Sequence, residues 1–155
     1  MTNNYPFSKQ LNEFVEAWFT DNQDKFKEYP SNQFNLDDAE KTFKEFQNHY
    51  VVNGTVPMWY DTNEDNIFGC AIVNAKFRAW HDYMHIITNN DFSLNGEKKV
   101  YAYQKRMFPE SWWWERLLIK SEIVEQAKYY TKTKVPIPNQ REFTLMFIEN
   151  IENGN

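Results

Sequence analysis

Hydrophobic residues recur at helical spacing over most of the chain, and turn-forming residues separate the segments in which they do so. The first segment begins near Ser8 and continues to Tyr29, where Pro30 ends it. A second begins near Asn35, where two aspartates suit the positive end of a helix dipole. We expect helices over about 8–29, 35–50, 63–88, 96–108, 111–135 and 139–151. The pattern therefore predicts an all-α fold.

Residues 51–60 interrupt this pattern, because Gly54 and Pro57 break a helix and β-branched residues fill the stretch. We expect an extended or irregular segment there, with at most one short strand, and one strand alone cannot make a sheet. The sequence contains no internal repeat and no linker. It therefore predicts a single compact bundle of about six helices, one domain over 1–155 with a polar tail from about 152.

The third predicted helix is apolar on two sides, which indicates a central position. One stripe has spacings of four, three, four and three and consists of Val73, Phe77, Trp80, Met84 and Ile87. The opposite side carries Ala71, Ala75, Ala79 and Ile86. Between them runs a narrow polar band formed by Asn74, Arg78, His81 and His85. Buried polar groups without partners cost a few kcal/mol, so this band must find partners.

His81 and His85 lie one helical turn apart, so both imidazoles can bind a single ion, with zinc the first expectation. Glu97 is well placed as the third ligand, because the short connection from Asn89 to Asn95 favours an antiparallel helix pair. Two histidines and one carboxylate leave coordination positions open for water, as in a catalytic zinc site. The pattern thus predicts a metal site.

Two further carboxylates lie near this pattern. Asp82 stands where the His-Glu-x-x-His zinc proteases have their general base, but Asp is one methylene shorter and points about 100° away from His81. It is a candidate for catalysis, and a positioning role comes first. Glu122 is a candidate for a fourth metal ligand, or for the acceptor of a hydrogen bond from the second ring nitrogen of a ligand histidine. A solvated face or a salt bridge is the simpler interpretation of Glu122.

An alternative interpretation needs no metal. The two histidines can be residues at the edge of the core, hydrogen-bonded to carboxylates or backbone, and Glu97 can serve the dipole of its helix. Trp112-Trp113-Trp114 point in three directions on a helix, so we expect core filling plus one outward indole that faces a partner.

Composition narrows the function classes. The 155 residues carry a net charge of −5, which does not favour general nucleic-acid binding, and the Lys98-Lys99 and Lys105-Arg106 pairs fit solvated helix faces. No apolar stretch is long enough for a membrane span, and the N-terminus lacks the features of a secretory signal. The lone Cys70 excludes an internal disulfide. We therefore expect a soluble, cytoplasmic protein without a nucleotide or organic cofactor.

The segment WHDYMHIITNNDFSLNGEKKVYAYQ, residues 80–104, resembles a segment of small, uncharacterised bacteriophage-encoded proteins that share His-Asp-x-x-His followed by Phe-x-x-x-Gly-Glu. The matching residues are His81, Asp82, His85, Phe92, Gly96 and Glu97, with a weaker match at Glu122, Gln126 and Gln140. The resemblance covers about a sixth of the chain. It implies a phage source, and hence the cytoplasm of a host cell, but no particular reaction.

Two functions follow from these observations. One is a metal-dependent enzyme, a hydrolase of unknown substrate, with the metal held by the three predicted ligands. The other is a non-enzymatic phage protein that binds a host or virion protein, in which the histidine band is a structural hydrogen-bond network. The first requires an accessible cavity over the histidines. The second predicts a filled, dry surround.

Overall fold

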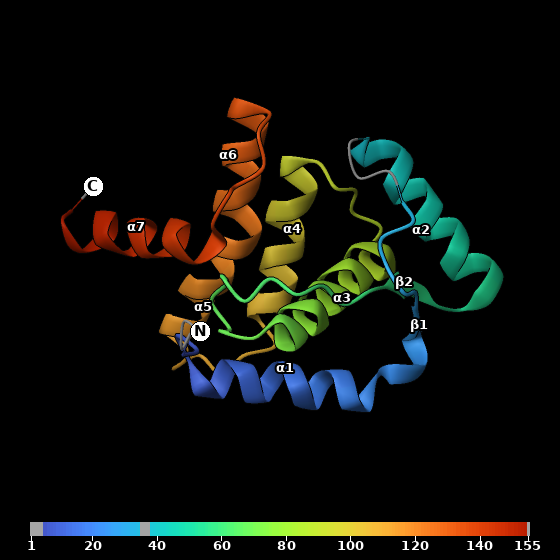
Figure 1. Cartoon of the computed structure of the whole chain (residues 1–155), viewed down its shortest axis with the longest axis horizontal. Coiled ribbons are helices and arrows are strands. Elements are labelled where there is room, and N and C mark those ends of the chain that lie inside the picture. The colour runs from blue at the N-terminus through green and yellow to red at the C-terminus, as the bar shows by residue number, and fades with distance from the viewer. Residues whose placement is uncertain (1–4, 35–37, 155) are drawn as a thin grey trace.

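The computed structural model describes residues 5–34 and 38–154, and it is an all-α bundle as predicted (Figure 1). The helices are α1 (Lys9–Asp21), α2 (Ala39–Asn53), α3 (Ala71–Thr88), α4 (Leu94–Lys105), α5 (Trp113–Lys120), α6 (Gln126–Thr133) and α7 (Gln140–Glu152). A π-helical turn, Ser121–Glu125, joins α5 to α6, so these two form one continuous helix. The expected start of the second helix, at 35–37, lies outside the described residues.

Side-chain caps explain where several helices begin. The side chains of Ser8, Asp38, Ser93 and Asn139 each accept a hydrogen bond from the backbone N–H three residues further on. Each cap gives a partner to one of the N–H groups that a helix leaves unpaired in its first turn. Gly54 ends α2 in the left-handed conformation, with φ 71°.

The first helix is shorter than predicted, because its expected last part forms a strand. The helix ends at Asp21, and after a 3₁₀ turn, Gln23–Lys25, the chain forms β1 (Phe26–Glu28). This strand pairs in parallel with β2 (Val56–Met58), all three residues of which are buried. The prediction of a helix to Tyr29 was therefore wrong, and the extended segment predicted at 51–60 has a partner strand.

The third helix begins at Ala71, not near residue 63 as predicted. Residues 61–70 form a loop that inserts Ile67 and Phe68 into the core. The buried Asn66 side chain holds this loop, because its Oδ1 accepts from Phe68 N and its Nδ2 donates to the Asn63 carbonyl. Side-chain bonds of this kind compete with the helical ones and delay the helix.

Helix α3 occupies the centre of the bundle, as predicted, and contacts α1, α2, α4 and β2. Val73, Phe77, Trp80 and Met84 are all buried. The prediction for Ile87 was wrong, since this side chain is 46% exposed. Its neighbour Ile86 instead packs against the aromatic residues of α2.

The three consecutive tryptophans divide as predicted. Trp112 and Trp114 pack against the core, and Trp114 Nε1 donates to the Phe7 carbonyl at 3.0 Å. Trp113 points outward and is 69% exposed. One of the three indoles is therefore free to face solvent or a partner.

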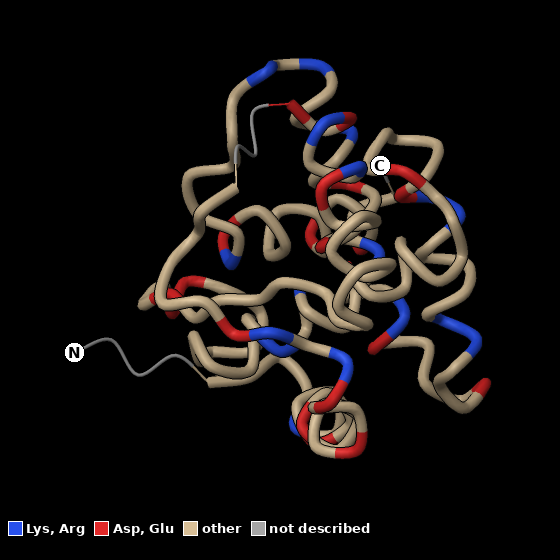
Figure 2. The backbone as a smooth tube through the Cα atoms, turned by 90° about the vertical axis from the view of Figure 1, so that its right-hand side faces the viewer, with Lys and Arg blue, Asp and Glu red and all other residues tan. Residues whose placement is uncertain are grey.

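The surface carries both signs of charge. Figure 2 shows Lys and Arg interspersed with Asp and Glu along the described chain. Among the described residues, no helix combines the length and the apolar character that crossing a membrane requires.

Candidate metal centre

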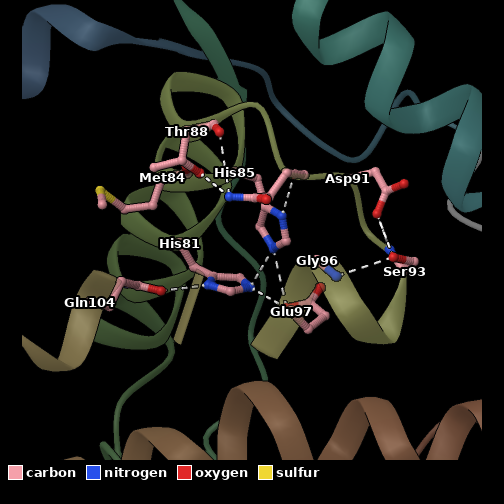
Figure 3. Close-up of polar contacts among 10 residues, drawn as sticks. His81, Met84, His85, Thr88, Asp91, Ser93, Gly96, Glu97 and Gln104 are labelled. Carbon is pink, nitrogen blue, oxygen red and sulfur yellow. Dashed lines mark hydrogen bonds and ion pairs between the residues drawn. The ribbon is translucent and has the colours of Figure 1, made fainter. Parts of the chain in front are cut away.

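His81, His85 and Glu97 converge on one point between α3 and α4 (Figure 3). Glu97 Oε2 lies 2.8 Å from His81 Nε2 and 3.2 Å from His85 Nε2. The two Nε2 atoms are 3.0 Å apart. The three residues predicted as metal ligands are thus brought together by the fold.

The other nitrogen of each imidazole is fixed by an oxygen. His85 Nδ1 lies 2.9 Å from the backbone carbonyl of Asn90, and His81 Nδ1 lies 2.7 Å from Gln104 Oε1. A carbonyl oxygen can only accept a hydrogen bond, so each Nδ1 carries the proton in the neutral ring. The Nε2 atoms therefore direct their lone pairs toward Glu97.

The centre consequently brings together three atoms that all accept hydrogen bonds. A proton or a cation has to lie between them, because three unscreened acceptors at this distance repel one another. Burial alone would lower the pKa of His81, but the adjacent Glu97 carboxylate outweighs it and raises the pKa to about 9. Burial likewise opposes the effect of His81 on Glu97, whose pKa nevertheless falls to about 2. Without a metal, His81 is an imidazolium paired with a carboxylate.

The spacing of the three atoms also fits one metal ion. Ligands 2.0–2.1 Å from a zinc ion lie about 2.8–3.0 Å from each other at octahedral angles and about 3.3–3.4 Å at tetrahedral angles. The observed separations are 2.8, 3.0 and 3.2 Å. A divalent cation can therefore replace the shared proton with little movement of the ligands.

The start of α4 explains how Glu97 is positioned. The Ser93 side chain caps the helix by accepting from Gly96 N, and Asp91 Oδ1 accepts from Ser93 N (Figure 3). A Cβ atom at Gly96 would overlap the Asp91 carbonyl oxygen. The glycine before Glu97 thus lets the 89–93 loop pack closely against the first turn of α4. It explains in physical terms why a Gly-Glu pair suits this position.

A cavity of about 390 Å³ adjoins the centre and is lined by His81 and Glu97. His85 lies behind them and is fully buried. The walls are partly aromatic, from Phe46, Trp59, Phe77 and Phe92. The surround of the histidines is therefore open on one side, as the enzyme interpretation requires, and not filled.

Asp82 and Glu122 both line this cavity, but neither belongs to the group of three residues, His81, His85 and Glu97, whose ligand atoms converge. Burial raises the pKa of Asp82 to about 6, against the opposing effect of the two histidines. Burial also raises the pKa of Glu122 to about 8, although the nearby Gln126 opposes the rise. The role of Asp82 in catalysis and that of Glu122 as a fourth ligand stay predictions.

Glu122 does not accept from a second ring nitrogen, which was one interpretation of the sequence, because Gln104 and Asn90 take those positions. Sequence reasoning missed both residues. Gln104 lies seven residues after Glu97, on the same face of α4, and this spacing could have identified it. Asn90 acts through its backbone carbonyl, which no side-chain pattern reveals.

Comparison of the chain with protein-family models, with curated proteins and with solved structures gave no match. The resemblance of residues 80–104 to phage proteins stays a prediction. The functional argument therefore depends on the geometry of the centre and its cavity.

Proposed function

We propose that this chain binds one divalent metal ion, zinc first, through His81 Nε2, His85 Nε2 and Glu97, and that it is a metal-dependent hydrolase acting in the adjoining cavity. The observation that carries the proposal is the convergence of two imidazole lone pairs and one carboxylate while both Nδ1 atoms are held by oxygens. Metal-binding histidines are oriented in this way by partners of their second nitrogen.

The cavity supports a catalytic role over a structural one. Structural zinc sites are closed by four protein ligands, whereas catalytic sites keep a position open for water. Three ligands converge here, and the cavity reaches His81 and Glu97 but not His85. When bound, a metal of this kind lowers the pKa of its water and so supplies a nucleophile at neutral pH.

The remaining groups of the cavity have roles suited to hydrolysis. Asp82 is the nearest carboxylate in sequence to the ligands and faces the same space, so we assign it the acceptance of a proton. The aromatic walls exclude water from the other side and hold the apolar part of a substrate. The chain's own residues thus position a substrate beside the ligands.

The first test measures metal content in protein purified without a His-tag or chelator. We expect close to one equivalent after incubation with zinc, manganese, iron or nickel, and none in the His81→Ala/His85→Ala double variant. His49→Gln is the matched control, because the third histidine is bonded to Tyr29 and Thr55, away from the centre. Circular dichroism checks that the double variant keeps its helices.

Glu97→Gln gives a second variant that keeps the size of the ligand but removes its charge. We expect zinc affinity to fall at least tenfold, because replacing a residue that only hydrogen-bonds to a metal ligand already costs about 10–100-fold in affinity. Wild-type protein that holds less than a tenth of an equivalent under all four metals would refute the proposal.

A hydrolase screen with chromogenic esters and amides then separates the metal site from the reaction. We expect turnover by the zinc-loaded protein that EDTA abolishes. Asp82→Asn should keep the metal stoichiometry and lose turnover. If the metal-loaded protein is inactive on all such substrates, the metal-site proposal stands, but the proposed catalytic role of Asp82 is refuted.

We also propose a phage source and the cytoplasm of the host as its location, on the basis of the resemblance of residues 80–104 and of the lone Cys70. Expression in the cell that the phage infects, followed by fractionation, tests the location. Recovery in a membrane or secreted fraction would contradict it.

A second function, binding to a host or virion protein, is supported by an apolar groove between α6 and α7. It has a volume of about 540 Å³ and is lined by Tyr129, Ile137, Phe143, Met146 and Phe147, among others. Figure 1 shows α7 extending away from the bundle. If the wild-type protein never holds metal, the histidine band is a structural network and this function replaces the enzyme.

A further inference from the structure

Buried polar atoms without partners gather on the wall of the cavity beside the metal centre. Within residues 5–34 and 38–154, eight buried side-chain nitrogen or oxygen atoms lack a hydrogen-bond partner. Four of them belong to cavity-lining residues: Arg78 Nε, Glu122 Oε1, Gln126 Nε2 and Gln140 Oε1. Of these four residues, Glu122 and Gln126 lie close enough for the Gln126 side chain to lower the pKa of Glu122. Each such atom costs about 1–3 kcal/mol when nothing pairs with it. A fold that concentrates this cost in one cavity indicates a ligand that supplies the missing bonds.

Three of these residues lie where the regular helix is interrupted or begins. Glu122 lies in the π-helical turn between α5 and α6, and Gln126 follows it on the first residue of α6. Gln140 is the first residue of α7. Single π-helical turns inside α-helices occur frequently at functional sites, because the extra residue re-aims neighbouring side chains. The π-helical turn therefore forms part of the cavity wall opposite α3.

The donor and acceptor types restrict the ligand. Gln140 Oε1 accepts hydrogen bonds, and Gln126 Nε2 and Arg78 Nε donate them. The Glu122 carboxyl, which burial keeps protonated at neutral pH by raising its pKa, can do either. A ligand that satisfies all four must present N–H donors and oxygen or nitrogen acceptors together. An amide edge, with N–H beside C=O, has this combination, and its planarity suits the aromatic walls.

The charges of the wall disfavour an anionic ligand. The carboxyl groups of Asp82, Glu97 and Glu122 line the cavity. The described lining residues include two cations, and both are already paired: Arg78 with Asp61 at 2.7 Å, and the His81 imidazolium with Glu97 at 2.8 Å. Apart from a metal ion at the centre, a phosphate or carboxylate would therefore meet no unpaired cation among the described lining residues.

We propose that this cavity binds an uncharged planar molecule with an amide-type edge, a nucleobase-like heterocycle or a small aromatic carboxamide, through Glu122, Gln126, Gln140 and Arg78. The cavity volume of about 390 Å³ lies within the range of small-molecule sites. The inference deepens the proposed function, since it names the substrate class of the same cavity. The four contacts themselves do not include the metal ligands.

Calorimetric titration with small probes tests the inference, on zinc-loaded and on EDTA-treated protein. The probes are uracil, cytosine and benzamide, and the matched controls are benzoate, which is anionic, and toluene, which has no polar edge. Titration to about 5 mM detects dissociation constants up to the millimolar range. We expect at least one amide-type probe to bind at least tenfold more tightly than both controls. Binding of the pyrimidines alone identifies the heterocycle, and binding of benzamide alone identifies the open carboxamide.

Two variants link binding to the wall. Glu122→Met and Gln140→Met keep the side-chain volume but remove both terminal polar atoms of the side chain, and we expect each to lower the affinity about tenfold or more. Glu125→Gln changes a carboxylate of the same π-helical turn that does not line this cavity, and should leave the affinity unchanged. Thermal unfolding confirms that each variant is folded.

The inference is overturned if no amide-type probe binds either form of the protein, or if benzoate and toluene bind as well as the amides. It also fails if the Met variants keep the wild-type affinity. A protein that takes up zinc but binds no probe refutes this inference alone. A protein that binds uracil or benzamide but no metal refutes only the metal-dependent function.

Discussion

The substitution Glu122→Gln should stabilise the protein at neutral pH and leave its stability unchanged in acid. Burial raises the pKa of this carboxyl from 4.5 to about 8, so the folded protein keeps a proton that the unfolded chain releases. A group whose pKa is raised by folding contributes most below its unfolded pKa, and that contribution is lost as the pH rises to the folded pKa. Wild-type stability should therefore fall between about pH 4.5 and pH 8.

The magnitude follows from the shift. In the unfolded chain the pKa of Glu122 is 4.5, so pH 7 lies 2.5 units above it. Each unit corresponds to about 1.4 kcal/mol of free energy between the protonated and ionised forms. Because folding makes this carboxyl keep its proton, Glu122 lowers the free energy of unfolding at pH 7 by at most about 3 kcal/mol relative to acid. Contact with the cavity reduces this figure. Gln has nearly the same shape and does not ionise, so the variant avoids the cost.

Urea unfolding at pH 4, 5.5, 7 and 8, in EDTA so that no metal contributes, measures the difference. We expect the curves of the two proteins to agree at pH 4 and to separate by up to about 3 kcal/mol at pH 7. Glu125→Gln is the control, because Glu125 is paired with Lys128 near the surface and should change stability by less than about 0.5 kcal/mol. A Glu122→Gln variant that is less stable than the wild type at pH 7, or a gap that does not change with pH, would refute the reasoning.

Other predictions concern the core and the metal centre. Trp80→Ala removes a fully buried side chain and should lower the free energy of unfolding by about 3–5 kcal/mol, measured by urea unfolding, whereas a loss below 1 kcal/mol would contradict its central place. Gly96→Ala places a methyl group against the Asp91 carbonyl, so we expect a lower melting temperature together with weaker zinc binding; unchanged values for both would show that the loop adapts freely. Zinc at a hundred times its dissociation constant should stabilise the wild type by about 2.7 kcal/mol in thermal unfolding, and an equal gain in His85→Ala would assign that zinc to another site.

Hydrophobic periodicity allowed most of the helices to be predicted, with errors at their ends. The helix predicted at 63–88 was wrong over its first eight residues, where Asn66 bonds to the backbone and competes with the helix. The first helix was wrong over its last eight, because residues 26–28 pair with a strand about 30 positions away. Both errors arise from interactions that helical spacing does not encode.

The residues of the candidate site could be predicted from the sequence about as well as the helices. Histidines four residues apart on a helix must lie on one face, so the sequence alone determined that His81 and His85 could share an ion. Glu97 was assigned from the short connection, and the structure brings it within 3.2 Å of both rings. Local spacing was sufficient here because the ligands lie within 17 consecutive residues.

The sequence by itself determined the all-α class, the central place of the third helix and the three residues of the candidate metal centre, since each follows from local periodicity and a short connection. Only the tertiary structure decided which oxygens hold the imidazoles, that a cavity adjoins them, and that Glu122, Gln126 and Gln140 meet Arg78 on its wall. These residues come from helices far apart in the chain. Their proximity depends on how the helices pack, which the pattern along any one helix does not specify.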